Sequence, residues 1–263
     1  MFKAIRVIII KDIKSILHSW KVWLPLIFLP FIFVIFMPSL LFYKLAYFKA
    51  DNLQDIETML KYIPHEYIFT THAQKAAFAF SHYFFPTLLL VIPIMTSTIL
   101  AANSFAGEKE QNTLESLLYT PLSLEELFFG KILGVFIPSY FVTLLSFIAL
   151  AFISNYWMMK ILPVYKLPLL RWGTYLFILC PTIVILGLTF SVWVSANCST
   201  FQEAQQLSSL VVFPIILIII GQANGLFVYK LLHLVFVAIF FVLLDLILIY
   251  LAAKSFTYER LLS

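Results

Sequence analysis

The residues of this sequence that could do chemistry gather between positions 105 and 131. The acids of that stretch are spaced through a polar run, Glu108-Lys-Glu-Gln-Asn-Thr-Leu-Glu115. Carboxylates so spread could form a surface for a basic partner. An ordinary solvated loop that carries charges for solubility would show them as well. Three leucines at 114, 117 and 118 would share one helical face, which a solvated loop does not need.

Two helix starts are predicted inside this stretch. Asn112 is a good N-cap residue, and Glu115 three positions later is in capping-box register. Pro121 disfavours a helical conformation of the residue before it, so the first helix is two turns at most. Ser123 followed by Glu126 is a second capping box. We therefore expect a short helix, a proline break and a second helix that bends into the next apolar segment.

The rest of the sequence offers no convincing pattern of catalytic residues. The seven glycines are scattered, and neither G-x-x-x-x-G-K-[ST] nor G-x-G-x-x-G occurs, so the usual phosphate-binding loops are missing from the sequence. The Glu125-Glu126 pair is similar to that of intramembrane proteases, but the arginine expected at EExxxR is Gly130. We expect no enzymatic activity in this chain and no cofactor bound to it.

Metal binding is also disfavoured. Three histidines could ligate a metal, but they do not form an H-E-x-x-H pair: His65, His72 and His82. Cys180 and Cys198 are 18 positions apart, so in one helical region they would lie too far apart for a disulfide.

One ionisable residue, Asp245, lies inside a long apolar run near the C-terminus. A charge inside a membrane is costly and by default suggests a functional site. Asp245 could face a polar cavity or bind a cation. Our preferred interpretation is a structural hydrogen bond to another helix.

The amino-acid composition predicts the environment of these residues. Of the 263 residues, 62% are hydrophobic and 11% are charged. Soluble domains carry about 45–50% apolar and about 25% charged residues. The composition excludes a soluble enzyme, a disordered chain and a free nucleic-acid binder, so we expect no nucleic-acid partner. It predicts an all-α membrane protein that contacts lipid directly.

A membrane-spanning helix needs about 20 mostly apolar residues. Six segments meet this condition: 22–43, 83–105, 132–154, 174–196, 207–225 and 231–253. The longest connection, 44–82, is predicted to be a loop outside the cytoplasm. These parts account for residues 1–263 as one transmembrane domain. Prolines inside several spans predict kinks, either for packing or to line a cavity.

The bias of lysine and arginine sets the orientation. Before the first span there are five cations and one acid, Asp12; the cations are Lys3, Arg6, Lys11, Lys14 and Lys21. This places the N-terminus in the cytoplasm, and six spans return the C-terminus there. We expect a multi-pass protein of a prokaryotic-type plasma membrane.

Residues 1–21 have their own periodicity. Apolar residues recur every three or four positions from Phe2 to Trp20, with most cations on the opposite face. This pattern is typical of an amphipathic helix that lies in the membrane interface. A simple extension of the first span is the alternative. Asp12 falls near the apolar side, and an interfacial helix does not explain it.

The stretch 108–131 resembles the signature of ABC-2 type permeases, the membrane subunits of one class of ABC exporters. The family pattern reads roughly E-[KR]-E-x-G-T-x-E-x-L-L-x-[ST]-P, followed by G-K near the next span. The matching residues are Glu108, Lys109, Glu110, Thr113, Glu115, Leu117, Leu118, Thr120, Pro121, Gly130 and Lys131. Asn112 departs from the glycine common there, but asparagine tolerates the left-handed backbone.

This resemblance implies a permease fold of the type V exporter kind. It implies that residues 106–121 form a cytoplasmic coupling helix that docks on a separate ATPase subunit. The residues carried over for ATPase coupling are Glu108, Glu110, Thr113, Glu115, Leu117, Leu118, Pro121 and Lys131. A second contact is implied weakly at Glu203 and Gln205, where a plain capped turn is equally plausible.

The resemblance also implies an assembly. Two ATPase copies would bind ATP and magnesium, and a second permease, identical or related, would complete the pathway between the two permeases. The cargo is a peptide, drug, lipidic molecule or ion, and the aromatic-rich spans suit an amphiphile. The alternative function is an ATP-independent channel or secondary transporter that uses Asp245 and the proline kinks.

Overall fold

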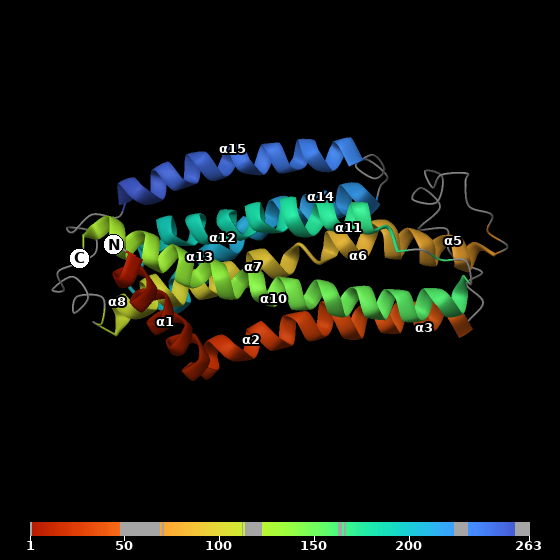
Figure 1. The fold of residues 1–263 in the computed structure, drawn as a ribbon, viewed down its shortest axis with the longest axis horizontal. Helices are drawn as coiled ribbons and strands as arrows, with labels where there is room; N and C mark the ends of the chain where they lie inside the picture. Colours follow the sequence, from red (N-terminus) through yellow and green to blue (C-terminus); the bar gives the residue numbers. More distant parts are fainter. Residues whose placement is uncertain are drawn as a thin grey trace.

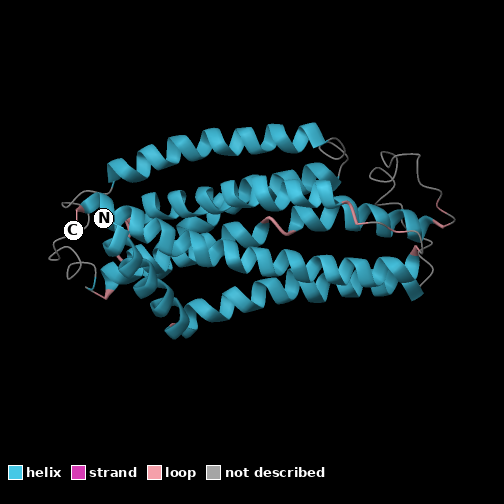
Figure 2. Ribbon diagram, viewed as in Figure 1, coloured by secondary structure: helices cyan, strands magenta, loops and turns pink. Residues whose placement is uncertain are grey.

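The computed structural model describes residues 2–47, 69, 71–111, 113, 123–162, 165, 167–223 and 231–255. Within these residues every regular element is a helix (Figure 2). The first half contains α1 (Phe2–His18), α2 (Trp20–Pro30), η1 (Phe31–Phe36), α3 (Met37–Tyr47), α5 (His72–Ala79), η3 (Phe80–Phe84), α6 (Phe85–Leu88), α7 (Val91–Ala102), η4 (Asn103–Gly107) and α8 (Glu108–Glu110). The second half contains α10 (Leu124–Ile161), α11 (Leu169–Thr174), η5 (Tyr175–Leu179), α12 (Cys180–Ser195), α13 (Phe201–Ser208), η6 (Ser209–Val212), α14 (Phe213–Ala223) and α15 (Leu231–Ser255).

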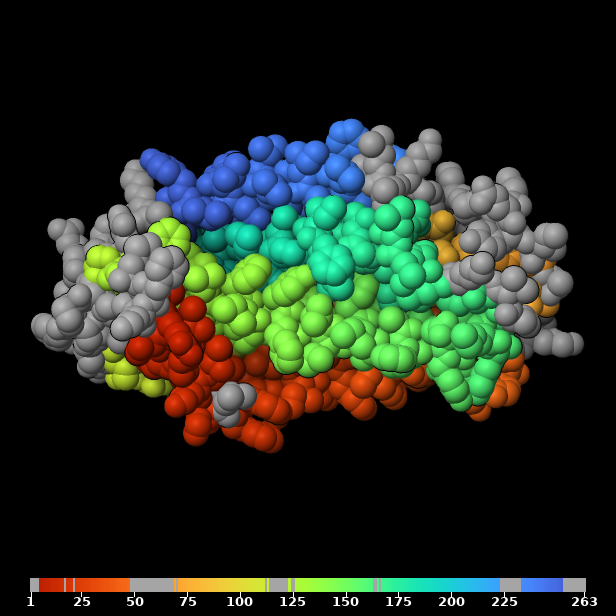
Figure 3. Space-filling model, in the orientation of Figure 1, coloured from red at the N-terminus to blue at the C-terminus, as the bar shows by residue number. Residues whose placement is uncertain are grey.

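Six of the described helical stretches are long and apolar enough to cross a membrane, as the sequence predicts. They are Val22–Tyr47, His72–Glu110, Glu126–Ile161, Leu169–Ser195, Phe201–Gln222 and His233–Ala252. They lie side by side in an elongated bundle, with α15 along one edge and α2 with α3 along the other (Figure 1), and the space-filling view in Figure 3 shows the same two edges in blue and in red to orange. The beginning of α1 and the end of α15 lie at the same end of the bundle.

The second span is the centre of the bundle, because it is buried along most of its length while the first and sixth spans are largely exposed. It packs closely on α12 where Gly187 faces Ser97: a Cβ at Gly187 would overlap Ser97 Oγ and lie 3.0 Å from the carbonyl oxygen of Ile94. Hydroxyl groups add polar links at this contact, since Ser191 Oγ donates to the carbonyl oxygen of Thr98 at 3.3 Å. The exposed apolar faces of the outer helices suit a hydrocarbon surrounding.

The predicted loop 44–82 is too long at both ends, because α3 continues to Tyr47 and α5 begins at His72. The helix predicted to start after Ser123 and to continue into the third span is α10, which runs unbroken from Leu124 to Ile161. Helix ends are set by capping hydrogen bonds, whereas the apolar run marks only the part that suits lipid. The Ser123–Glu126 capping box is present and starts α10.

Helix α1 is a separate element, since the chain leaves helical geometry at Ser19 before α2 begins. It crosses the bundle at one end and packs mainly on α10 (Figure 1). Its packed face consists of Ile8, Asp12 and Ile16, while Val7 and Ile10 are exposed. An interfacial position for α1 stays a prediction, and its face toward the protein differs from the apolar stripe expected between Phe2 and Trp20.

Candidate functional site

Five polar residues from three parts of the chain meet where α1, the end of the second span and the start of α10 come together. We call them the charge cluster: Lys11 and Asp12 of α1, Ser104 and Glu108 at the end of the second span, and Lys131 of α10. Glu108 and Lys131 belong to the 105–131 stretch that the sequence marks out, whereas Lys11, Asp12 and Ser104 lie before it in the chain. It is nearly closed to solvent, since Asp12, Ser104, Glu108 and Lys131 are all buried.

Lys131 is the centre of the cluster and is fully buried. Its Nζ donates to Glu108 Oε2 at 2.7 Å, to Ser104 Oγ at 3.3 Å and to the carbonyl oxygen of Ser104. The Nζ also lies 5.0 Å from the centroid of the Phe105 ring. Each of these partners is on the second span, so Lys131 joins the start of α10 to the last turns of that span.

Glu108 has two cationic partners on two different helices. Its Oε2 accepts from Lys131, and its Oε1 accepts from Lys11 Nζ at 2.5 Å. The side chain of Lys11 is 39% exposed, whereas that of Lys131 is inaccessible. A buried carboxylate with hydrogen-bonded cations on both oxygens is a satisfied group, because its desolvation is offset on each side.

Asp12 completes the cluster from α1. Its Oδ2 accepts from Ser104 Oγ at 3.0 Å, and Lys11 Nζ lies 3.7 Å from its Oδ1. Burial raises the pKa of Asp12 above its ordinary value, while the nearby Lys131 opposes that rise. The apolar side of α1 therefore carries an acid because that side faces a polar group of the protein.

A pair of glycines lets α1 approach α10 closely enough for these contacts. A Cβ at Gly130 would lie 2.9 Å from Ile8 Cδ1, and one at Gly134 would lie 3.1 Å from Asp12 Oδ2. Small residues four apart on one helix face allow two helices to pack tightly in membranes. The Gly130-Lys131-Ile-Leu-Gly134 sequence therefore supplies both the cation and the space for α1.

The other described residues predicted for ATPase coupling lie at the surface. Thr113 Oγ1 donates to the carbonyl oxygen of Glu108 at 3.2 Å. Glu110 is exposed, and its Oε2 accepts from the backbone N–H of Phe201 at 2.8 Å. This bond joins the end of the second span to the first turn of α13, so the two polar connections at this end of the bundle touch.

The predicted second contact is part of that turn. The backbone N–H of Glu203 donates to Thr200 Oγ1 at 3.3 Å, and Glu203 Oε2 accepts from the backbone N–H of Ser199 at 3.2 Å. Glu203 is exposed and Gln205 is half-buried. The geometry is that of a capped helix start with Glu203 at the surface.

Four predicted coupling residues lie outside the described residues: Glu115, Leu117, Leu118 and Pro121. Of those described, Glu108 and Lys131 are buried, and Lys131 Nζ donates to Glu108 Oε2. A role of these two residues in ATPase coupling stays a prediction.

Asp245 lies on α15, is 5% exposed, and is not near the charge cluster in the sequence or among its contacts. The preferred interpretation, a hydrogen bond to another helix, is not met at its Oδ1, which has no hydrogen-bond partner among the described residues. Those described residues also contain no group of three or more His, Cys, Asp or Glu side chains placed to hold a metal ion.

Sequence reasoning missed Lys11, Asp12, Ser104 and the glycine pair as parts of one site. Two signals were present: an acid on the apolar side of an amphipathic helix, and two glycines four residues apart at the start of a span. Neither signal names its partner, because the cluster depends on how three separate helices pack.

A bundle with six helices long and apolar enough to cross a membrane is the architecture of a multi-pass membrane protein. Comparison with known families shows which kind. Residues 6–251 match the model of the ABC-2 family transporter proteins, so the chain belongs to this family. No curated protein matches the chain. The family consists of membrane subunits that work with ABC ATPase subunits, so this chain is a multi-pass membrane protein and not itself the ATPase.

Proposed function

We propose that this chain is the permease subunit of an ATP-binding-cassette exporter in a prokaryotic plasma membrane, with both termini in the cytoplasm. It would pair with a second permease, identical or related, and with two copies of a separate ATPase that bind ATP and magnesium. An amphiphilic cargo such as a hydrophobic peptide would cross between the two permeases. The observation that supports the proposal most directly is the charge cluster beneath the signature loop.

The cluster supplies a mechanical reason for this assignment. Glu108 precedes the loop and Lys131 follows it, and their 2.7 Å contact closes the loop at its base. An ATPase that moved residues 106–121 would therefore pull on the second span and on α10 together. Through Lys11 and Asp12 the same motion would reach α1.

The outward surface of this region suits such a partner. Glu110 and Glu203 are exposed and are joined through the first turn of α13. Together with Glu115, Leu117 and Leu118 of the signature, they would offer an acidic, partly apolar contact to the ATPase. Thr113 and Pro121 would set the shape of the loop, while Glu108 and Lys131 would hold its base.

The experiment has two parts. Mild-detergent purification of the tagged chain from its native membrane should recover a P-loop ATPase at about one copy per permease. Alanine substitution of Glu115 and Leu118 should then leave insertion intact but abolish the stimulation of ATP hydrolysis by cargo. A matched change, Lys160→Met, alters an exposed lysine at the other end of α10 and should leave stimulation unchanged.

A chain that is recovered alone across several gentle detergents would contradict the proposal, as would full cargo stimulation in the Glu115 and Leu118 variant. Either result would favour an ATP-independent channel or secondary transporter.

A further inference from the structure

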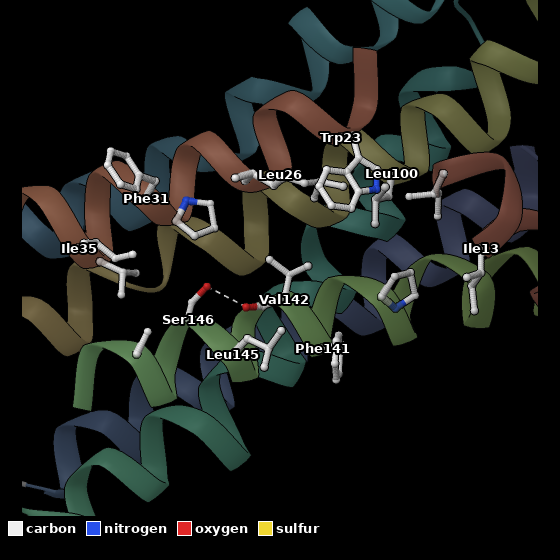
Figure 4. Close-up of a pocket in the computed structure, with 16 residues that line it drawn as sticks. Ile13, Trp23, Leu26, Phe31, Ile35, Leu100, Phe141, Val142, Leu145 and Ser146 are labelled. Carbon is white, nitrogen blue, oxygen red and sulfur yellow. Dashed lines mark hydrogen bonds between the residues drawn. The ribbon is translucent and has the colours of Figure 1, made fainter. Parts of the chain in front are cut away.

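A groove lies between the first span and α10, near the end of the bundle where α1 crosses (Figure 4). Its volume is about 610 Å³, and most of its lining is apolar. One wall is formed by α2 and η1, including Trp23, Leu26 and Phe31, and the other by α10, including Phe141 and Leu145. Ile13 of α1 lines it as well, so the basic helix stands at one end of the groove.

The groove exists because the two walls cannot pack together there. Pro30 ends α2 where the backbone becomes the π-helical segment η1, and Pro138 faces the groove from α10. Across from the first span, α10 presents the small side chains of Ser146 and Ala149. Ser146 Oγ donates to the carbonyl oxygen of Val142 at 2.7 Å, so its hydroxyl is already satisfied and the wall stays apolar in character.

The length and lining of the groove indicate its occupant. At about 1.5 Å per residue, the lining from Pro138 to Ala149 extends for roughly 16 Å, which is about half of the 30 Å hydrocarbon core. That length corresponds to one leaflet, and a wall that is almost wholly apolar suits a flexible hydrocarbon chain.

The exposed cations of α1 indicate which lipid headgroup would bind at this end of the groove. Arg6 and Lys14 of α1 are exposed, while the one acid of that helix, Asp12, is buried in the charge cluster and does not offset them. Trp23, which is 37% exposed, lies at this same end, where indole rings favour the membrane interface. Lysine and arginine at a membrane surface attract anionic lipids by about 1 kcal/mol each.

We propose that this groove binds one acyl chain of an anionic phospholipid of the cytoplasmic leaflet, with the headgroup phosphate at α1. The assignment of the leaflet rests on the proposed orientation, whereas binding itself does not. The lipid would fill the space between the first span and α10 and would connect α1 to both. It is therefore a resident ligand of the permease fold.

The test uses the full chain in vesicles of three parts phosphatidylcholine to one part phosphatidylglycerol. A trace of phosphatidylglycerol carries a photoreactive diazirine in its acyl chain, and labelled peptides are quantified by mass spectrometry. Labelling of Phe141 and Leu145 should exceed that of Leu243 and Leu246, which are equally exposed on α15, at least fivefold.

Ser146→Phe should plug the groove and lower its labelling at least fivefold, while α15 labelling, which reports a folded bundle, is unchanged. Ala149→Leu is a milder plug that should lower labelling in the same direction. The matched control, Leu246→Phe on the exposed face of α15, should change nothing in the groove. Replacing both Arg6 and Lys14 by glutamate should reduce labelling by the anionic probe several-fold but not by a phosphatidylcholine probe.

Equal labelling of the groove and α15, or unchanged labelling after both plugs, would overturn the proposal. So would efficient disulfide trapping between two copies that carry Leu145→Cys, because a second copy would then occupy the groove. These measurements need no ATPase, so they are independent of the purification that tests the transporter assignment.

Discussion

Substituting methionine for Lys131 removes the central cation of the charge cluster while keeping an apolar side chain of similar length. The change leaves Glu108 with one of its two cationic partners and leaves Ser104 without its donor. Removing one partner of a buried ion pair costs about 3–5 kcal/mol. Because Lys11 still neutralises Glu108, we expect the low end of that range, about 3 kcal/mol.

The assay is thermal unfolding of the detergent-purified chain followed by tryptophan fluorescence. At about 2–4 °C per kcal/mol for a chain of this size, the midpoint should fall by roughly 6–12 °C. Glu108→Gln should destabilise the chain on its own. The two changes together should cost less than the sum of the single changes, by about 1–3 kcal/mol, since residues in direct contact are coupled.

Lys160→Met is the matched control, because Lys160 is an exposed lysine on the same helix whose Nζ donates only to Tyr156 within the described residues. Its midpoint should equal that of the unaltered chain. A Lys131→Met midpoint as high as the control, or additive costs in the double variant, would refute the reasoning that these charges hold one another in the bundle.

Three further predictions concern the packing of α1, the titration of Asp12 and the role of Asp245. Gly134→Leu should displace α1 by contact with Asp12, lower the free energy of unfolding by about 1–3 kcal/mol, and speed amide hydrogen exchange in α1. Gly173→Leu is the control: a Cβ there would lie 4.0 Å from Phe177 Cδ2, so the exchange rate in α1 should not change. Burial raises the pKa of Asp12 above its ordinary value of 3.8. The protonated carboxyl group therefore contributes its full stabilisation below pH 3.8, and this contribution is lost as the pH rises through the pKa of the folded state. Asp12→Asn should remove this part of the pH dependence of the unfolding midpoint. Asp245→Asn should leave ATP-driven transport within about twofold of the unaltered chain, and a loss of transport would instead support a charge-dependent pathway at this residue.

The spans could be predicted because composition dictates them. About 20 apolar residues in a row have few solutions other than a membrane helix, so the six segments stand out without any knowledge of packing. Local hydrogen-bonding patterns were equally readable, as at Ser123, where the side chain accepts from the backbone N–H of Glu126 at 3.1 Å. These features depend on residues that are neighbours in the chain.

The charge cluster could not be predicted in the same way. Glu108 and Lys131 both stand in the family signature, but the sequence suggests that acids there face a partner, and only the packing of α8 against α10 turns them toward each other. Asp12 is separated from Ser104 by 92 positions. Such contacts depend on which helix faces meet, and a periodic pattern specifies a face without specifying what covers it.

The two cations on Glu108 differ in a way that bears on the proposed motion. Lys131 is inaccessible and is held by three acceptors on the second span, so separating it from Glu108 would leave the buried charge of Lys131 without a hydrogen-bonded carboxylate. Lys11 is 39% exposed and also lies 3.7 Å from Asp12, so it can leave Glu108 and be compensated by water and by Asp12. A force applied to the loop would therefore keep the second span and α10 together and release α1 first. Under the proposed function, α1 is the part of this bundle whose attachment the ATPase cycle can change at the lowest cost in free energy.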